Sequence, residues 1–436
     1  MTKRLLCLIT FFAILCATLF AQTAPSASPN SDEELRFVVY LSRHGVRSPT
    51  GKPAQYHTYS SAQWPAWDVP PGYLTAHGSR LMQLFGAYDR IQLAGEGLLN
   101  ATGCEDASRV TIYADSDQRT RETGNALAAG LFPGCGLVVK GLPENTADPL
   151  FHPQEANTVS ANSELAVAAI AGRIGGDPNN LTTIYHARLA ELDAILAKCG
   201  EPDVTTQKRV SILEIPAKLS ISKGNHPAEL RGPINTASTL AENLLLEYTQ
   251  GMAPSNVGWG CVNSDNLRPL LELHTAASDF TQRTTVIAQL QASNLLDHIR
   301  RSIQQAATGK PVHGAISRLG DRALFLVGHD TNLSNVASLL NMTWVIDGRR
   351  DDTPPGGALV FELWRSRKTK QDSVRAYYTT QTLEQMRSEA VLSLGDPPQR
   401  VPVFLPGCGT ENLSCSLHSF AQTVSQAIDP HSVSPN

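Results

Sequence analysis

The sequence predicts an α/β protein in which helices flank a mostly parallel sheet and a smaller α-helical domain is inserted between two parts of that sheet. Three observations support this fold class. Short apolar segments early and late in the chain are each followed by a polar cluster and then by a helical pattern. The middle of the chain is helical in its periodicity, and strand-like segments return after it. We therefore expect an α/β domain built from residues 34–159 and 274–427, and a helical domain from residues 160–273.

The chain begins with a pattern typical of a secretory signal peptide. Two basic residues precede an apolar run over residues 5–20, and a polar segment rich in Pro, Ser and Ala follows Ala21. We expect export to remove residues 1–21 and residues 22–33 to form a disordered leader. A membrane anchor is the alternative, but the apolar run is short for a bilayer span. The mature protein is therefore expected to be periplasmic or secreted, with no membrane association.

Three short segments are continuously apolar and rich in β-branched residues, which predicts strands buried on both faces. They cover residues 37–41, 110–114 and 323–327, and helical patterns follow over residues 120–131 and 332–340. In a parallel sheet the carboxyl ends of the strands meet at one edge, and ligands bind beyond that edge. The polar clusters that follow the three segments are therefore expected to converge.

The inserted region and the tail differ in their periodicity. Residues 165–174, 182–196 and 237–248 are rich in Ala, Leu and Glu at helical spacing, which predicts helices. Residues 358–364 and 375–379 are rich in β-branched and aromatic residues, which predicts strands of the α/β domain.

The composition argues against several classes of function. The formal net charge is −4 without a block of like charges, so nucleic acid is not an expected partner. No Cys-x-x-Cys pair and no His-Glu-x-x-His motif occurs, so we expect no metal and no cofactor. Gly309 and Lys310 do not form a phosphate-binding loop, because Gln304 and Pro311 occupy two of the required positions.

Eight cysteines are present, and two of them lie in the predicted signal peptide. An even number of remaining cysteines in an exported protein predicts disulfides. The spacing alone leaves their pairing open.

The first polar cluster has the residue types that phosphoryl transfer requires. Arg43 and Arg47 place two guanidinium groups within three residues of the imidazole of His44. Arginine binds two phosphate oxygens at once through its planar fork, and histidine can act as a nucleophile. The alternative is a pair of surface arginines beside a turn histidine. The extended run directly after a buried strand favours a functional site.

The other two clusters supply further candidates. His329 can donate a hydrogen bond to phosphate, and Asp330 can protonate a leaving group, although an aspartate there could also cap the following helix. Arg119 begins a helix after a buried strand, where anions bind favourably. Arg121 is a rival for the same role.

The run Arg43-His44-Gly45-Val46-Arg47-Ser48-Pro49, together with His329-Asp330, resembles the histidine acid phosphatase family. The likeness is closest to the bacterial periplasmic 4-phytase and glucose-1-phosphatase group and extends from about residue 35 to residue 425, with further support from residues 115–130 and 353–364. The resemblance implies a phosphoglycerate-mutase-like α/β domain with a smaller helical domain over the site.

The resemblance also implies roles for individual residues. His44 would accept the phosphoryl group as a phosphohistidine, and Asp330 would protonate the leaving group. The phosphate would be held by Arg43, Arg47, Arg119 and His329. The implied substrate is a small-molecule phosphate monoester, no metal or cofactor is implied, and we expect a monomer.

The outer pocket follows the family less closely. Thr50, Lys52, Glu242 and Arg283 are candidate pocket residues by resemblance. Phytases carry a lysine at the position of Gly51, whereas the lysine of this chain, Lys52, is one residue further along. Thr239 stands where phytases carry a methionine. Phytate and sugar phosphates therefore both stay open as substrates.

The resemblance implies two disulfides, Cys104 with Cys135 and Cys408 with Cys415. Cys199 matches one half of a third disulfide, but the near partner found in the family is missing. Cys261 is the cysteine left over, so a Cys199–Cys261 bridge is our hypothesis.

The function expected overall is that of an exported acid phosphomonoesterase. A phosphomutase of the related branch is one alternative, against which the signal peptide argues. A binding protein that captures phosphorylated ligands without turnover is the other, and it would not need both His44 and Asp330.

Overall fold

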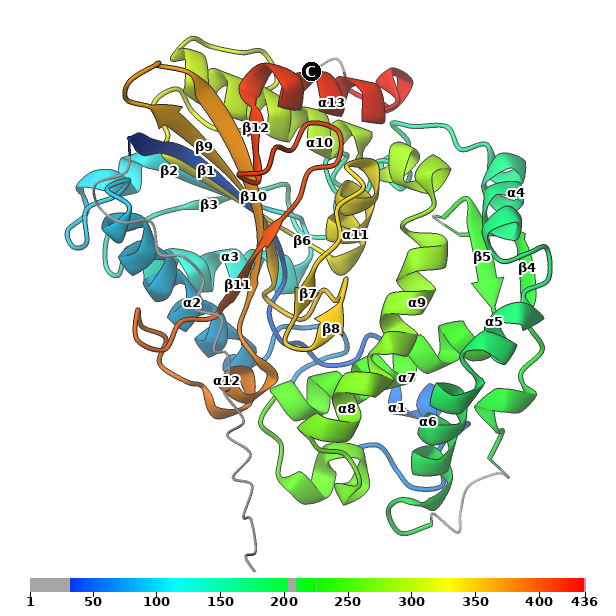
Figure 1. The fold of residues 1–436 in the computed structure, drawn as a ribbon. Helices are drawn as coiled ribbons and strands as arrows, with labels where there is room; N and C mark the ends of the chain where they lie inside the picture. The colour runs from blue at the N-terminus through cyan, green and yellow to red at the C-terminus, as the bar shows by residue number, and fades with distance from the viewer. Residues whose placement is uncertain (1–31, 203–208, 225, 435–436) are drawn as a thin grey trace, which may run out of the picture. The chain divides into compact units, whose positions relative to one another are not determined.

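An eight-stranded sheet forms the centre of the computed structural model, which describes residues 32–202, 209–224 and 226–434 (Figure 1). The strands of this sheet are β1 (Glu33–Arg43), β2 (Val110–Ala114), β3 (Val139–Lys140), β6 (Ala323–Gly328), β9 (Ala358–Ser366), β10 (Asp372–Thr380), β11 (Gln399–Val403) and β12 (Ser414–Ser416). Their order is β11–β10–β9–β1–β6–β2–β3, with β12 beside β10. β1, β6, β2 and β3 are parallel, and the other four strands extend the sheet through antiparallel pairs. The predicted α/β class is confirmed.

The parallel half of the sheet brings three chain segments to one edge. β6 lies between β1 and β2, and the stacked rings of Tyr40 and Phe325, 4.5 Å apart, mark the register of β1 with β6. Arg43 is paired with Gly328, and Ala114 with Val327, so the three strands end at the same level. The convergence expected from the sequence is therefore confirmed.

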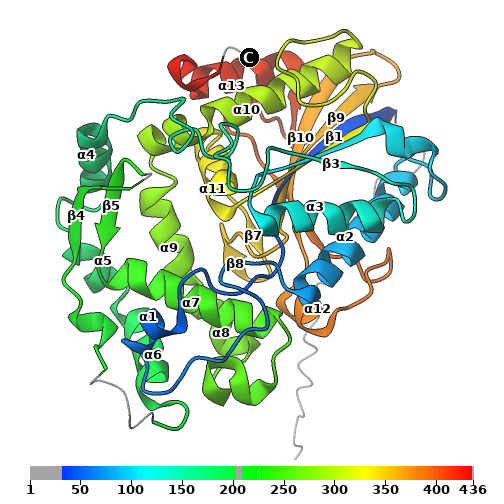
Figure 2. The same ribbon diagram turned by 180° about the vertical axis from the view of Figure 1, so that it is seen from behind.

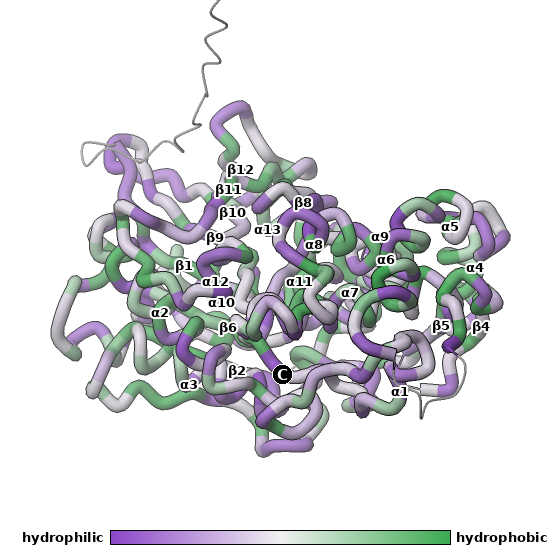
Figure 3. Tube along the Cα trace, turned by 90° about the horizontal axis from the view of Figure 1, so that it is seen from below, coloured by the Kyte–Doolittle hydropathy of each residue, from purple (hydrophilic) through white to green (hydrophobic). Residues whose placement is uncertain are grey.

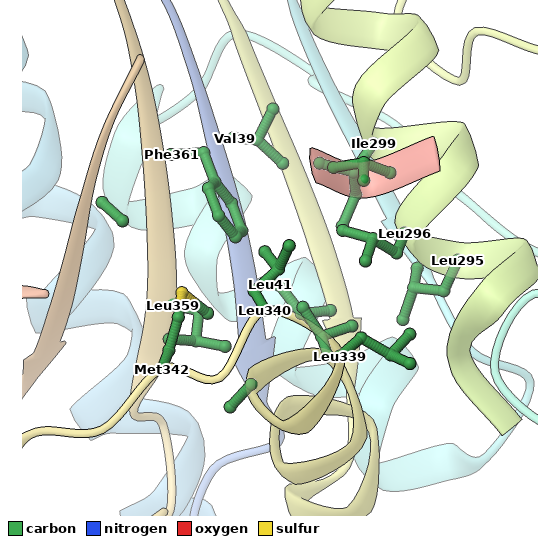
Figure 4. Close-up of a cluster of buried hydrophobic side chains, with 14 of the residues drawn as sticks. Val39, Leu41, Leu295, Leu296, Ile299, Leu339, Leu340, Met342, Leu359 and Phe361 are labelled. Atoms are coloured by element: carbon green, nitrogen blue, oxygen red, sulfur yellow. The ribbon is translucent and has the colours of Figure 1, made fainter. Parts of the chain in front are cut away.

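Helices cover both faces of this sheet, as the two opposite views show (Figures 1 and 2). One face is covered by α2 (Ala76–Gly95) and α3 (Gln118–Leu131), and the other by α10 (Thr285–Thr308), α11 (Asp330–Leu339) and α13 (Leu417–Ala427). β1 serves both faces because successive side chains of a strand point to opposite sides. Val39 and Leu41 enter the core under α10 and α11 (Figure 4), whereas Val38 and Tyr40 pack toward α2 and α3.

A third apolar core belongs to the inserted region. Its helices are α4 (Ser163–Arg173), α5 (Asn179–Ile184), α6 (His186–Lys198), α7 (Pro233–Thr249), α8 (Ser264–Leu270) and α9 (Glu272–Thr281). The core also takes in Trp64 and Leu383 from outside residues 160–273. All described residues belong to one compact unit, so the division into two domains stays a prediction. Hydrophobic and hydrophilic residues alternate along the helices (Figure 3), as in helices that bury one face.

Shorter elements complete the described chain. They are α1 (Pro53–His57), α12 (Leu383–Ser388), the two-stranded pairs β4 (Lys218–Ile221) with β5 (Ala228–Arg231) and β7 (Val345–Ile346) with β8 (Arg349–Arg350), and the 3-10 turns at Glu105–Arg109, Ile212–Glu214, Pro254–Gly260 and Pro430–Ser432. Among the described residues, no helix is both long enough and apolar enough to cross a membrane.

The structure corrects three details of the sequence prediction. The helix predicted over residues 182–196 is broken at Tyr185, whose ψ of 13° ends α5 before α6 begins. The β4–β5 hairpin lies in the region expected to be helical, and it pairs Leu219 with Leu230. Glu33 was placed in a disordered leader, but it starts β1 opposite Ser366 and forms an ion pair with Arg375. The predicted signal peptide and residues 22–31 of the predicted leader lie outside the described residues.

Three disulfides join the six cysteines of the described residues. The Cα–Cα distances are 5.3 Å for Cys104–Cys135, 6.1 Å for Cys199–Cys261 and 5.2 Å for Cys408–Cys415. The two pairings implied by the family are confirmed. The hypothesised third bridge is also present, and it ties the end of α6 to the segment after α7.

Candidate active site

Backbone hydrogen bonds hold the segment that follows β1. The amide of His44 donates to Gly328 O at 2.9 Å, and the amide of Gly356 donates to His44 O at the same distance. The amide of Gly45 donates to Thr123 Oγ1 at 2.9 Å. A side chain at position 45 would lie 2.8 Å from Met82 Cγ, so this close approach requires glycine. Three hydrogen bonds therefore hold the backbone of His44 and Gly45 in place.

The His44 imidazole is oriented by its own backbone. Its Nδ1 donates a hydrogen bond to Gly45 O at 2.9 Å, so Nε2 carries the lone pair. Burial lowers the pKa of His44 well below its ordinary value, and the guanidinium groups of Arg119, Arg43 and Arg47 lower it further. The ring therefore keeps a neutral, nucleophilic Nε2 to a lower pH than an ordinary histidine does.

Two buried arginines flank this ring and share one carboxylate. Arg43 donates to Thr353 O at 2.7 Å and forms an ion pair with Glu242 of α7. Arg47 Nη2 lies 3.1 Å from the same Glu242 oxygen. Burial would raise the pKa of Glu242, but Arg47 and Arg43 outweigh burial and lower it. Glu242, a predicted pocket residue, is thus an ionised partner of the arginine pair.

Arg119 completes a cluster of three guanidinium groups. It is the second residue of α3, and its Nη2 lies 2.6 Å from Asp117 and 3.4 Å from His329 Nδ1. The rival Arg121 instead donates to Leu142 O at 2.7 Å, away from this cluster. The Nε–H groups of Arg43, Arg47 and Arg119 are all buried without an acceptor. An anion bound among them would supply the missing acceptors.

His329 is held by a carboxylate that sequence reasoning missed. Asp115 follows β2, and its Oδ2 lies 2.7 Å from His329 Nε2 and 2.9 Å from His152 Nε2. Burial would raise the pKa of Asp115, but the hydrogen bonds from His152 and His329 lower it. Asp115 lies in the second polar cluster, so its position was a usable signal. His152 is a lone histidine in a loop, and nothing in the sequence marks it.

Asp330 lies between an arginine and a second missed histidine. Its Oδ2 is 3.4 Å from Arg43 and 3.6 Å from His274 Nε2, and His274 Nδ1 lies 3.1 Å from Ser238 Oγ. Burial would raise the pKa of Asp330, but Arg43 and His274 hold it well below its ordinary value. Burial would lower the pKa of His274, but Asp330 and Glu242 raise it. Without substrate the carboxyl group is therefore ionised, whereas the sequence-based expectation was a protonated acid.

The remaining predicted pocket residues fall into two groups. Thr50 is exposed and lies near Arg119. Both residues border Gly72: a Cβ atom added to that glycine would lie 3.5 Å from Thr50 and 3.8 Å from Arg119. Lys52 is exposed at the start of α1. Arg283 donates to Met342 O and lies over the Trp344 ring, and both contacts turn it away from the arginine cluster. Arg283 is therefore engaged outside the arginine cluster, and the role of Lys52 in the pocket stays a prediction.

A hollow of about 290 Å³ opens beside these groups. It is lined by Arg119, His152, Gln282, His329, Asp330 and Asn335, among others. A larger hollow of about 440 Å³ is lined by residues of α8, α9 and β8 and holds none of the predicted catalytic residues. We assign the site to the smaller hollow, because Arg119, His329 and Asp330 line it. His44, Arg43 and Arg47 are not among its lining residues and lie buried beside it.

Two groups of site residues contain side chains of types that can bind metals. They are Asp115, Asp117, His152 and His329, and Glu242, His274 and Asp330. In the first group the histidines donate to Asp115 and Arg119 pairs with Asp117. In the second, Arg43 pairs with both carboxylates. These carboxylates already have cationic or N–H partners, so we assign neither group to a metal.

Comparisons with known proteins show the family to which this chain is similar. The model of the family described as Histidine phosphatase superfamily (branch 2) matches residues 34–192 and 275–379. Phytase AppA of Escherichia coli (strain K12) is 36% identical over 97% of this chain and 98% of its own length. Glucose-1-phosphatase of Providencia rettgeri is 29% identical over 95% of this chain and 98% of its own. The solved structure of Hafnia alvei phytase in complex with myo-inositol hexakis sulphate is 36% identical, with a TM-score of 0.84 over 93% of this chain and 100% of that one.

Proposed function

The chain belongs to branch 2 of the histidine phosphatase superfamily, and from this premise we propose that it is an exported acid phosphatase that hydrolyses phosphate monoesters through a phosphohistidine at His44. The three buried guanidinium Nε–H groups without acceptors carry this proposal. A phosphate monoester bound among Arg43, Arg47 and Arg119 would offer acceptors to these guanidinium groups, and their positive charge would balance its own.

In the first step His44 is the nucleophile. The lone pair on Nε2 attacks phosphorus, and the bond from phosphorus to the ester oxygen breaks. His44 needs no base to activate it, because Nδ1 already holds the ring proton against Gly45 O. The lowered pKa keeps Nε2 unprotonated in acid, where most histidines are charged.

The departing ester oxygen needs a proton, and Asp330 is the proposed donor. Its low pKa in the empty site means that this proton has to be acquired on substrate binding. A bound phosphate shares the positive charge of Arg43 with Asp330 and adds negative charge beside it, and both effects raise the affinity of Asp330 for a proton. In acid the ester itself is a monoanion that carries the proton into the site. The acidic preference therefore reflects the protonation of the enzyme–substrate complex.

In the second step water attacks phosphorus and the bond to His44 Nε2 breaks. Asp330, now ionised, accepts the proton of that water, and inorganic phosphate leaves. The proposed substrates are phytate and sugar phosphates, because relatives named phytase and glucose-1-phosphatase both align over nearly the whole chain. Export is proposed from the pattern of residues 1–21, and three disulfides fit an oxidising compartment.

The first experiment is a phosphate-release panel with phytate, glucose 1-phosphate and p-nitrophenyl phosphate, from about pH 3 to about pH 8. We expect release from at least one ester with an optimum in acid. His44→Ala should abolish release, and the exposed His186→Ala is its matched control. Transfer of phosphate within one substrate, without release, would instead indicate a mutase. Binding without any release would indicate a binding protein.

The second experiment tests Asp330. Asp330→Asn should slow the hydrolysis of glucose 1-phosphate by about 100-fold or more. It should slow the hydrolysis of p-nitrophenyl phosphate far less, because p-nitrophenolate leaves without a proton. Asp265→Asn, whose side chain is 96% exposed, is the control. Equal slowing of both esters would contradict the role of Asp330 as the acid.

A further inference from the structure

One oxygen of Asp115 serves two histidines. Its Oδ2 accepts from His329 Nε2 at 2.7 Å and from His152 Nε2 at 2.9 Å, while its Oδ1 is buried without a partner. The two imidazole rings lie 4.9 Å apart at an angle of 48°. The side chain of His329 is 6% exposed and that of His152 is 32% exposed. The outer histidine therefore meets solvent, and the inner one meets the phosphate-binding cluster.

This geometry fixes where the protons are. Both Nε2 atoms face the same carboxylate oxygen, so both must carry hydrogen. The remaining nitrogen of His329 is Nδ1, which lies 3.4 Å from Arg119 within the cluster. Since Nε2–H is used by Asp115, His329 can donate to a phosphate from Nδ1 only when the ring carries both protons.

We propose that His152 is a positioning residue for this reaction: through Asp115 it holds His329 in the orientation that meets phosphate, and through its charge it sets the pH above which His329 no longer donates. The inference rests on the proposed function, because it concerns how that site binds phosphate. His152 touches neither His44 nor Asp330 and has no direct part in bond breaking.

The direction of the effect follows from the charges around the pair. Burial would lower the pKa of His152, but its hydrogen bond to Asp115 raises it. Burial lowers the pKa of His329, and Arg119 and His152 lower it further against the opposing effect of Asp115. His152 therefore holds its proton while His329 titrates beside a cation. The charged and titratable groups around the pair are Asp115, Asp117, Arg119, His44, Asp148, Glu155 and His226.

Two substitutions separate orientation from charge. His152→Gln keeps an N–H donor for Asp115 and removes the charge, whereas His152→Leu removes both. The assay is the pH dependence of kcat/KM for p-nitrophenyl phosphate. With His152→Gln we expect the alkaline limb to move up by about one pH unit, because His329 loses a neighbouring cation. With His152→Leu we expect the same shift of the alkaline limb and, in addition, a kcat/KM at the optimum that is lower by about tenfold or more. His152→Gln should keep most of the wild-type kcat/KM at its optimum.

A second measurement does not depend on turnover. The ring signals of His329, followed by NMR across the same pH range, should titrate higher in His152→Gln than in the wild type. His186→Gln, an exposed histidine of α6, is the matched control and should change neither the pH profile nor the titration of His329.

An alkaline limb and a His329 titration that stay in place in His152→Gln, or move to lower pH, would overturn the proposal. So would a His152→Leu variant as active at its optimum as the His152→Gln variant. A wild-type protein that releases no phosphate from any ester contradicts the proposed function instead. The NMR titration still tests His152 in that case.

Discussion

Glu247 makes the stability of this protein depend on pH in a direction that can be calculated. It lies in α7 with 1% of its surface exposed, and its Oε2 accepts a hydrogen bond from the amide of Gly258 at 2.8 Å. Burial raises the pKa of its carboxyl group from 4.5 to about 8, and the single hydrogen bond from Gly258 opposes this only in part. The side chain is therefore neutral in the folded protein at acidic pH.

The sign follows from proton linkage. Between its unfolded and folded pKa values, Glu247 keeps a proton in the native state that the unfolded chain has released, so stability falls as pH rises. Below about pH 4.5 both states are protonated and the group contributes nothing. A pKa of about 8 costs the native state about 2 kcal/mol between about pH 4 and about pH 6, and about 3 kcal/mol by about pH 7.

Glu247→Gln removes this dependence while keeping a carbonyl oxygen for the Gly258 amide. For a chain of this size, about 3 kcal/mol corresponds to a Tm difference of about 3–4 °C. We expect the variant to melt higher than the wild type by that amount at about pH 7 and to match it at about pH 4. The measurement is differential scanning calorimetry across this range, with the exposed Glu411→Gln as control. A Tm gain of equal size at both pH values would refute the reasoning.

Two further predictions concern packing and cross-linking. Gly78→Ala should lower kcat/KM more than tenfold, because the new Cβ would lie 2.1 Å from the carbonyl oxygen of Val46, two residues after His44. Gly95→Ala, in the same helix with open space around it, should leave activity unchanged. Equal activity of the two variants would contradict this account. Replacing both Cys199 and Cys261 with serine should lower the free energy of unfolding by about 2–5 kcal/mol, measured as a lower Tm. Phosphate release at room temperature should be largely retained. An unchanged Tm would mean that the bridge adds nothing to stability.

Local pattern was sufficient for most of the sheet and for the centre of the site. The buried strands of a parallel sheet are continuous apolar runs, so β2 was predicted at its observed bounds and β6 to within one residue. The proposed nucleophile His44 and two arginines lie within five consecutive residues, and their spacing alone indicated phosphate chemistry. The rule that parallel strands end at one edge then brought His329 and Asp330 to the same place.

The direction in which a residue points from its helix explains why the sequence could not predict every side chain of the site. Arg119 and Arg121 are two positions apart on α3 and so point in nearly opposite directions, toward His329 and toward Leu142. Gln282 and Arg283 are adjacent, and Gln282 lines the hollow while Arg283 turns to Trp344. Which of two neighbouring residues faces a site depends on how the whole segment packs.

The two missed histidines mark the limit of sequence reasoning. His152 and His274 lie far along the chain from their partners and in no local motif, so nothing but the folded arrangement shows that one meets Asp115 and the other Asp330. The sequence by itself determined the fold class, and it was enough to propose His44 as the nucleophile and to predict the phosphate-binding residues, because these depend on short runs of residues. Tertiary structure alone decided the protonation states of Asp330, Asp115 and the histidines around them, because a pKa depends on burial and on charges that only folding brings together.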